Sequence, residues 1–226
     1  MVGMKFIEPI NHVDEHSNPC HEKGNDYEPF DDRVTMAKGT LFVVSAPSGA
    51  GKTTLINAIR PLFPNLLYSV SYTTRPPRQG EVEGQSYYFV RTDQFERMIR
   101  SDEFLEWKKV HGNYYGTPRG PVTQALAAGR KMILDIDVQG AMDVFSRVPG
   151  AIGIFVTVSD LSVLEDRLRK RGTDSEEAIR LRIANAAIEI KAAEKFDYSI
   201  INDDLGLAVR DLTRIISEAC NCRAFG

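Results

Sequence analysis

A short apolar run, a glycine-rich turn and a helix-like stretch follow one another between residues 41 and 59, and this order limits the possible folds more than any other feature. Leu41-Phe-Val-Val-Ser-Ala46 begins with four consecutive apolar residues, which predicts a strand buried on both faces. Pro47-Ser-Gly-Ala-Gly51 then leads into a helical stretch from Lys52 to about Ile59. A buried strand that runs directly into a helix is typical of α/β folds with a parallel sheet.

The turn has the composition of a phosphate-binding loop. Gly49 and Gly51 allow successive backbone N–H groups to face one anion, and the helix N-terminus adds a partial positive charge. Lys52 can neutralise the β- and γ-phosphates of a nucleoside triphosphate, and the hydroxyl of Thr53 can bind Mg²⁺.

One position departs from the usual P-loop pattern, because Ala46 replaces its first glycine. An ordinary glycine-rich turn with an exposed lysine is the alternative, which the flanking strand and helix disfavour. The loop by itself predicts a nucleoside triphosphate site and does not identify a reaction. The residues expected to contact ATP here are Ala46, Pro47, Ser48, Gly49, Ala50, Gly51, Lys52, Thr53 and Thr54.

Strands and helices alternate along most of the remaining chain. The expected further strands are 131–137, 151–158 and 198–202, and the expected helices are 121–129, 160–171, 174–195 and 207–220. Thr173 with Glu176 has the spacing of a capping box at the start of the longest helix. This alternation predicts a parallel sheet flanked by helices.

Residues from about 70 to 117 break this alternation. Short strand-like pieces rich in Tyr, Phe and Trp lie at 87–90, 104–107 and 113–115, between turns that contain Gly and Pro. One helix-like stretch lies among them at 93–100. We therefore expect a small antiparallel subdomain inserted beside the main sheet.

Composition disfavours several classes of function. The chain has 226 residues, a net charge of −3 and a pI of about 5.9, so a broad nucleic-acid-binding face is not expected. No apolar run is long enough to cross a membrane, and residues 1–37 lack the plan of a secretory signal. We expect this N-terminal extension to be disordered or loosely packed and the protein to be cytoplasmic. Cys20, Cys220 and Cys222 form neither a disulfide framework nor a zinc motif.

Two arginines lie three positions apart on a proline-rich turn in Ser69-Val-Ser-Tyr-Thr-Thr-Arg-Pro-Pro-Arg-Gln-Gly-Glu81. The prolines stiffen the backbone, and the guanidinium groups of Arg75 and Arg78 suit bidentate capture of a phosphate monoester. A solvated loop with unrelated arginines is the alternative when this segment is considered alone.

Eight short motifs follow one another from about Gly39 to the C-terminus. They are Ser-Ala-Pro-Ser-Gly-Ala-Gly-Lys-Thr, Ser-Val-Ser-Tyr-Thr-Thr-Arg-Pro-Pro-Arg, Gly-Glu-Val-Glu-Gly-Gln-Ser-Tyr-Tyr-Phe, Glu-Phe-Leu-Glu-Trp, Gly-Asn-Tyr-Tyr-Gly-Thr, Ile-Leu-Asp-Ile-Asp-Val-Gln-Gly, Arg-Gly-Thr and Ile-Ile-Asn-Asp-Asp. Each motif is weak alone, but their order is specific, and in it the chain resembles the guanylate kinase family. The resemblance implies a P-loop kinase that transfers the γ-phosphoryl group of ATP to GMP with Mg²⁺.

The resemblance also implies a division of residues 38–226 into three parts. These are a core at 38–69, 121–160 and 192–226, a GMP-binding subdomain at 70–120, and a helical lid at 161–191. The residues implied for GMP are Arg75, Arg78, Tyr87 and Tyr115 at the phosphate, Ser71, Glu106 and Thr117 at the guanine, and Asp137 on the same side.

Glu106 suits guanine for a physical reason. Guanine presents N1–H and its 2-amino group as adjacent donors, and one carboxylate can accept from both. Adenine leaves such a buried acceptor unpaired, which is costly. A surface acid that alternates with Leu105 and Trp107 is the alternative, and the tyrosines at 87 and 115 could equally be ordinary aromatic packing.

Two acids, Asp135 and Asp137, lie at the end of the strand predicted at 131–137. Carboxylates at the end of a parallel strand face the crevice where ligands bind. By resemblance, Asp135 acts with Thr53 on Mg²⁺, directly or through water, while Asp137 faces GMP. Helix capping is the alternative role for either acid.

Arg167 and Arg171 are four positions apart and share one face of a predicted helix. By resemblance they close over the polyphosphate together with Arg182. The implied catalytic set is Lys52, Arg75, Arg167, Arg171 and Arg182. A basic, solvated helix face is the alternative.

Asn202 and Asp203 resemble the family's adenine-contact region. No covalent intermediate is expected, because the phosphate oxygen of GMP can attack the γ-phosphorus directly. The expected partners are the small nucleotides ATP and GMP, without nucleic acid or membrane.

Other functions compete with this interpretation. A guanylate-kinase-like scaffold module without catalysis would lose its phosphate-binding residues, whereas this chain keeps Lys52, Arg75 and Arg167. A kinase for another phosphorylated acceptor is disfavoured by Glu106. A GTPase is disfavoured because the sequence contains no Asn-Lys-x-Asp stretch.

Overall fold

The computed structural model describes residues 39–110, 112–172 and 175–221, without the side chains of Arg171, Cys220 and Asn221. The extension at 1–37, Cys20, Cys222 and Thr173 lie outside these ranges. No helix within them combines the length and the hydropathy needed to cross a bilayer.

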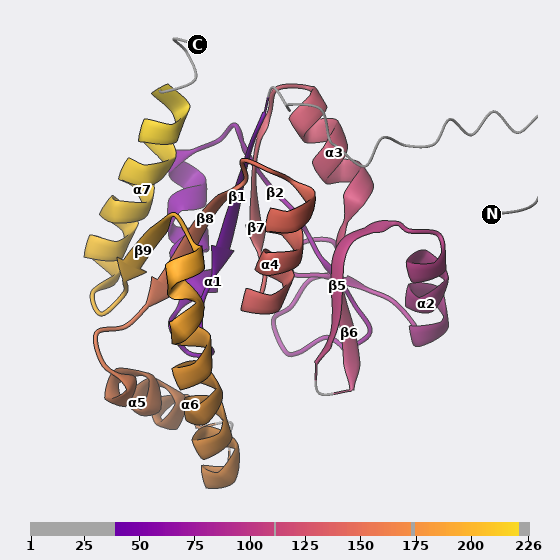
Figure 1. Ribbon diagram of the computed structural model, residues 1–226. Helices are drawn as coiled ribbons and strands as arrows, with labels where there is room; N and C mark the ends of the chain where they lie inside the picture. Colours follow the sequence, from indigo (N-terminus) through magenta and orange to yellow (C-terminus); the bar gives the residue numbers. More distant parts are fainter. Residues whose placement is uncertain (1–38, 111, 173–174, 222–226) are drawn as a thin grey trace, which may run out of the picture. The chain divides into compact units, whose positions relative to one another are not determined.

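A five-stranded parallel sheet forms the centre of the structure (Figure 1). Its strands, in spatial order, are β2 (Leu66–Tyr68), β7 (Lys131–Asp135), β1 (Thr40–Ser45), β8 (Ile152–Thr157) and β9 (Tyr198–Ile201). Every neighbouring pair is parallel, so the predicted parallel sheet is confirmed. The strand β2 was not predicted, because its three half-buried residues show no periodicity.

Helices cover both faces of this sheet. Successive side chains of a strand point to opposite faces, and the apolar run of β1 therefore places apolar side chains on each face. Leu41 and Val43 of β1 pack into one core with α3 (Arg119–Ala127) and α4 (Val138–Arg147). Phe42 and Val44 pack into a second core on the opposite face. That second core is closed by α1 (Lys52–Ile59) and α7 (Leu205–Asn221), which lie together in Figure 1.

Most predicted helices are present with shifted ends. The helix expected at 174–195 is α6 (Glu176–Ile190) followed by the 3-10 helix η2 (Lys191–Lys195), and a second 3-10 turn, η1 (Arg60–Leu62), extends α1. Ser175 caps α6, because its side chain accepts a hydrogen bond from the N–H of Ala178. The prediction that Thr173 begins this helix was therefore wrong.

A smaller sheet holds residues that the sequence analysis assigned to the inserted subdomain. Its order is β4 (Tyr88–Phe89), β3 (Tyr72–Thr73), β6 (Asn113–Pro118) and β5 (Phe104–Val110). β3 pairs with β6, and β6 with β5, in antiparallel fashion, but β3 and β4 are parallel. The sheet is mixed, which corrects the prediction of an antiparallel one. The long connection 74–87 returns the chain to its starting end and so permits the parallel pair.

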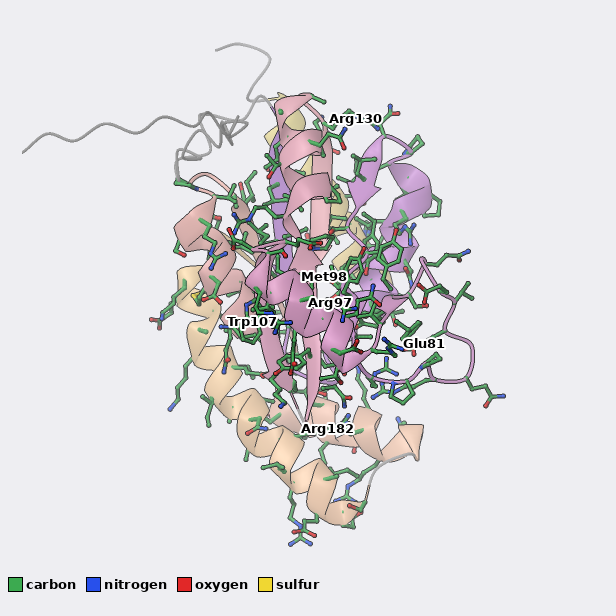
Figure 2. The ribbon with its side chains drawn as sticks, turned by 90° about the vertical axis from the view of Figure 1, so that its right-hand side faces the viewer. Glu81, Arg97, Met98, Trp107, Arg130 and Arg182 are labelled. Atoms are coloured by element: carbon green, nitrogen blue, oxygen red, sulfur yellow. The ribbon has the colours of Figure 1, made fainter. Side chains whose placement is uncertain are left out.

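The small sheet has its own core. Phe95 and Met98 of α2 (Thr92–Arg100) pack against Phe104, and the rings of Phe95 and Phe104 stack with centroids 4.3 Å apart. Figure 2 labels Met98 on this helix and Trp107 on the neighbouring strand β5, where the indole is partly exposed.

The helices α5 (Leu161–Arg171) and α6 pack against the glycine-rich turn. Leu164 and Ala186 share a small core with Ala50 of that turn and with Val158. The cavity described below therefore has a helical wall on this side.

Gly153 on β8 tests how tightly the core is packed. A Cβ at this position would lie 2.6 Å from Phe145 Cζ and 3.0 Å from Phe196 Cδ1, and these two rings already contact each other. We expect Gly153→Ala to lower the free energy of unfolding by about 1–3 kcal/mol, because the core would be overpacked. Urea denaturation measures this change.

Gly120→Ala is the matched control. Gly120 is exposed in α3, and a Cβ there would meet no atom within 4 Å. Because alanine is the better helix former, this variant should be as stable as the parent or more stable by up to about 1 kcal/mol. Equal losses in both variants would contradict the packing argument.

Candidate active site

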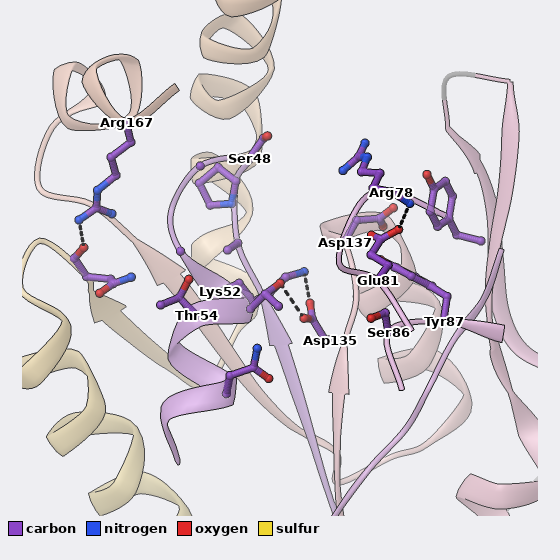
Figure 3. Close-up of a pocket in the computed structure, with 18 of the residues that line it drawn as sticks. Ser48, Lys52, Thr54, Arg78, Glu81, Ser86, Tyr87, Asp135, Asp137 and Arg167 are labelled. Carbon is purple, nitrogen blue, oxygen red and sulfur yellow. Dashed lines mark hydrogen bonds and ion pairs between the residues drawn. The ribbon is translucent and has the colours of Figure 1, made fainter. Parts of the chain in front are cut away.

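The carboxyl ends of the central strands border a cavity of about 1090 Å³ (Figure 3). A smaller cavity of about 280 Å³ extends toward the small sheet. Both cavities are lined by a common set of predicted site residues. That set is Lys52, Thr53, Tyr87, Tyr115, Asp135 and Asp137.

The glycine-rich turn has a left-handed backbone at two glycines. Gly49 has φ 93° and Gly51 has φ 85°, a region that side chains disfavour. A Cβ at Gly51 would also lie 2.5 Å from Nδ2 of Asn202. Among the non-glycine residues of the described chain, Asp102 alone has a positive φ, so Ala46 replaces the usual glycine without strain.

Lys52 and Asp135 lie side by side beneath this turn (Figure 3). Nζ of Lys52 is 2.9 Å from Oδ1 of Asp135 and donates to the carbonyl of Ile136 at 2.5 Å. The hydroxyl of Thr53 donates to Oδ2 of the same aspartate at 3.2 Å. A hydroxyl and a carboxylate on adjoining elements are oxygen ligands that Mg²⁺ accepts alongside water and phosphate, so these residues fit the metal.

Asn202 lies under the turn and is 4% exposed. Its side-chain Nδ2 donates to the backbone carbonyl of Ala50 at 2.7 Å. The backbone carbonyl of Asn202 accepts from Nη2 of Arg167 at 2.6 Å. The side chain of Ser159 and its backbone N–H both donate to the carboxylate of Asp203, and these hydrogen bonds lower the pKa of Asp203. Asn202 lines the large cavity, whereas Asp203 is not among its lining residues.

Arg75 and Arg78 enter the same cavity from the proline-rich loop. Nη2 of Arg75 is 2.8 Å from Oε1 of Glu81, and this contact is the main cause that raises the pKa of Arg75. The ring of Tyr87 lies 5.6 Å from the Arg75 guanidinium. Burial, reinforced by Asp135, raises the pKa of Tyr87 to about 12, so its hydroxyl keeps a proton to donate.

A β-bulge aims Glu106 into the small cavity. Phe104 pairs with Pro118 and Glu106 with Thr117, so Leu105 is the extra residue. As a result, Phe104 packs in the small core and Leu105 in the main core. The third consecutive side chain, Glu106, lines the cavity although it is only 6% exposed.

The carboxyl of Glu106 is held on both sides. The hydroxyl of Thr117, itself fully buried, donates to Oε1 at 2.6 Å. Oε2 lies so close to Gly140 that a Cβ there would be 2.7 Å away. Burial, with a smaller contribution from Asp137, raises the pKa of Glu106 to about 7. A partner with two N–H donors would stabilise the ionised form.

Asp137 has a structural contact as well as a place in both cavities. Its Oδ1 accepts from the N–H of Gly140 at 2.7 Å and so caps α4. This capping role matches the alternative weighed from the sequence. Ser71 also lines the small cavity, on the same side as Glu106.

The predicted lid arginines have different surroundings. Arg167 lines the large cavity, and the side chain of Arg171 is not described. Arg182 lies on α6 (Figure 2). Arg169, for which no role was predicted, forms ion pairs with Glu165 on its own helix and with Glu176 on α6.

Two acids in the large cavity were missed from the sequence. Glu81 binds Arg75, and Glu189 of α6 lines the wall beside the turn. Burial raises the pKa of Glu189, and Asp137 raises it further. Glu81 ends the proline-rich segment that contains both arginines, but its pairing with Arg75 depends on the folded path of the loop.

A P-loop with an adjoining lysine–aspartate pair, facing two arginines and a buried acid, defines a P-loop phosphotransferase with a second ligand site. The family model described as guanylate kinase matches residues 38–219. The chain belongs to the guanylate kinase family.

Individual relatives agree with this assignment. A guanylate kinase of Carboxydothermus hydrogenoformans is 52% identical over 80% of this chain and 89% of the relative. A guanylate kinase of Geobacter sulfurreducens is 49% identical over 81% of this chain and 91% of the relative. The crystal structure of guanylate kinase from Anaplasma phagocytophilum superimposes with a TM-score of 0.68 at 32% identity, over 81% of this chain and 87% of that one.

The buried Glu106 carboxyl should make stability depend on pH. Folding raises its pKa from 4.5 to about 7, so the protonated carboxyl contributes fully to the free energy of unfolding below pH 4.5, and this contribution is lost as the pH rises through 7. Relative to Glu106→Gln, the free energy of unfolding of the parent should fall by on the order of 3 kcal/mol between pH 5 and pH 8. Denaturation without nucleotide at several pH values measures the difference.

Glu194→Gln, at an exposed carboxyl, is the control. Its stability should follow that of the parent at every pH. Parallel pH profiles for the parent and Glu106→Gln would contradict the raised pKa.

Proposed function

We propose that this protein transfers the γ-phosphoryl group of ATP to GMP and releases ADP and GDP. The observation that carries the proposal is the buried carboxyl of Glu106, which faces a cavity shared with Lys52 and Asp135. A buried hydrogen-bond acceptor beside a phosphate-binding loop would bind guanine within reach of the phosphates of ATP. A cytoplasmic location and soluble nucleotide partners belong to the same proposal.

The acceptor nucleotide would occupy the small cavity and the proline-rich loop. Glu106 would accept from N1–H and the 2-amino group of guanine, with Thr117 and Ser71 holding the neighbouring polar atoms. Arg75, Arg78, Tyr87 and Tyr115 would bind its phosphate. These side chains line the two connected cavities, except for Thr117, which is buried behind Glu106.

The donor nucleotide would bind along the P-loop. Its phosphates would face the loop backbone and the helix N-terminus, and Lys52 would move from its contact with Asp135 toward them. Thr53 and Asp135 would hold Mg²⁺, directly or through water. When bound, Mg²⁺ neutralises charge on the β- and γ-phosphates.

Transfer then depends on position and charge rather than on a covalent intermediate. The acceptor phosphate is ionised near neutral pH and needs no general base. Arg167, with Arg171 and Arg182, would stabilise charge on the transferred group. Arg167 now binds the carbonyls of Asn202 and Asp203, so it would exchange these partners for phosphate oxygens when the lid closes and excludes water.

The base preference is tested by a coupled assay of ADP release with ATP, Mg²⁺ and either GMP, AMP, UMP or CMP. We expect turnover with GMP alone and a loss of about 100-fold or more in Lys52→Ala, because a transition-state cation is removed. Lys109→Ala, at an exposed lysine, is the control and should leave turnover unchanged. Turnover with another nucleoside monophosphate would contradict the proposed recognition of guanine by Glu106. GMP binding without turnover would favour the scaffold module.

A matched pair of lid variants tests the transition-state role of Arg167. Arg167→Gln should lower kcat by about 10³-fold, because a well-placed arginine stabilises the transferred group. Arg169→Gln on the same helix should lower it little, since Arg169 is engaged by Glu165 and Glu176. Steady-state kinetics with GMP measures both. Equal effects would assign Arg167 to lid structure instead.

A further inference from the structure

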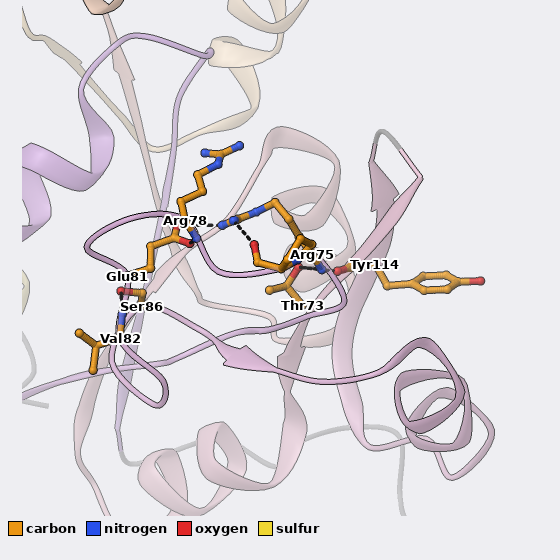
Figure 4. A network of polar contacts seen from close by, with 8 residues as sticks. Thr73, Arg75, Arg78, Glu81, Val82, Ser86 and Tyr114 are labelled. Carbon is orange, nitrogen blue, oxygen red and sulfur yellow. Dashed lines mark hydrogen bonds and ion pairs between the residues drawn. The ribbon is translucent and has the colours of Figure 1, made fainter. Parts of the chain in front are cut away.

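Glu81 connects the two arginines of the proline-rich loop (Figure 4). Its Oε1 lies 2.8 Å from Nη2 of Arg75, and its Oε2 accepts from the backbone N–H of Arg78 at 2.7 Å. The N–H of Glu81 in turn donates to the carbonyl of Arg78 at 3.1 Å. One carboxylate therefore holds the side chain of one arginine and the backbone of the other.

The start of the loop is tied down independently. The hydroxyl of Thr73 accepts from the N–H of Arg75 at 3.2 Å and donates to the carbonyl of Tyr114 at 2.9 Å (Figure 4). The N–H of Tyr114 donates to the hydroxyl of Thr74 at 2.9 Å. The loop can keep this attachment to β6 without Glu81, so the carboxylate serves the arginines and not the sheet.

The contacts of Arg75 leave part of it available. A guanidinium carries five N–H donors; the bonds to Glu81 and to the carbonyl of Pro76 use two of them, and the Tyr115 hydroxyl engages another. The ring of Phe89 lies 6.0 Å away and restricts the group from another side. The remaining donors are oriented before a ligand arrives, while the side chain of Arg78 lines the large cavity (Figure 3).

We propose that Glu81 is the positioning residue of the acceptor-phosphate site, fixing the distance and orientation of Arg75 relative to Arg78. This inference rests on the proposed function. Glu81 need not touch the acceptor. Its carboxylate holds Arg75 in the orientation that a phosphate monoester requires, and preorganisation of this kind contributes to affinity.

The test compares GMP with guanosine, which has the same base and ribose but lacks the phosphate. We expect Glu81→Ala to weaken GMP binding about 10- to 100-fold and Glu81→Gln about 10-fold, because bonds to a charged group are lost. Guanosine affinity, followed by NMR titration, should change less than about twofold in both variants, because Glu106 and Thr117 are untouched. The KM for GMP should rise while the KM for ATP stays unchanged.

Glu83→Gln is the matched control. Glu83 is an exposed acid in the same loop, and its carboxylate accepts from the backbone N–H of Phe89 at 3.0 Å. Its GMP affinity should equal that of the parent. Thermal unfolding of every variant identifies any general loss of structure, and the milder Glu81→Gln keeps the test valid if Glu81→Ala unfolds.

Three results would overturn the inference. Unchanged GMP affinity in the Glu81 variants would remove the positioning role while leaving the proposed function intact. An equal loss of guanosine and GMP affinity would assign Glu81 to the fold of the small sheet. Failure of the parent protein to bind GMP would overturn the proposed function and this inference together.

Discussion

The hydrogen bond from the Asn202 side chain to the carbonyl of Ala50 is the contact on which the rest of the site depends. It joins the end of β9, at one edge of the central sheet, to the loop that follows β1 in its middle. Arg167 of α5 donates to the backbone carbonyl of the same asparagine, so α5 is attached at this point too. A side chain at position 51 would collide with Asn202, and the loop, the strand end and α5 therefore form one coupled unit. A phosphate-binding loop needs such support, because its backbone N–H groups must stay directed at the ligand.

Features determined by neighbouring residues could be predicted from the sequence. The strand β1, the glycine-rich loop and α1 depend on local backbone preferences, and α1 spans the predicted residues. The burial of alternate β1 side chains on opposite faces follows from the apolar run alone. The helix α4 was missed although its signal is present, since Asp137 stands at its N-cap and apolar residues recur through Val144. The specific roles at the candidate site came from the resemblance to a family and not from periodicity.

Features that depend on distant residues could not be predicted. The three residues of β2 form a strand only because β7 offers a free edge. The parallel pairing of β3 and β4 depends on the path of a long loop, which composition does not specify. The same holds for two acids of the site. Glu81 pairs with Arg75 only in the folded loop, and Glu189 lines the cavity only because α6 packs beside the P-loop. The local sequence around a charged residue does not identify the residue that contacts it after folding.

The bulge in β5 has a consequence for how this protein can evolve. Phe104, Leu105 and Glu106 are consecutive, yet they serve a small core, the main core and a ligand cavity. An insertion or a slip in this strand would turn the acid away from the cavity and at the same time expose one of the two apolar side chains. The proposed reading of guanine and the packing of the two cores therefore depend on one strand register. Selection for a folded protein also preserves the direction of the side chain at position 106, whichever residue occupies it.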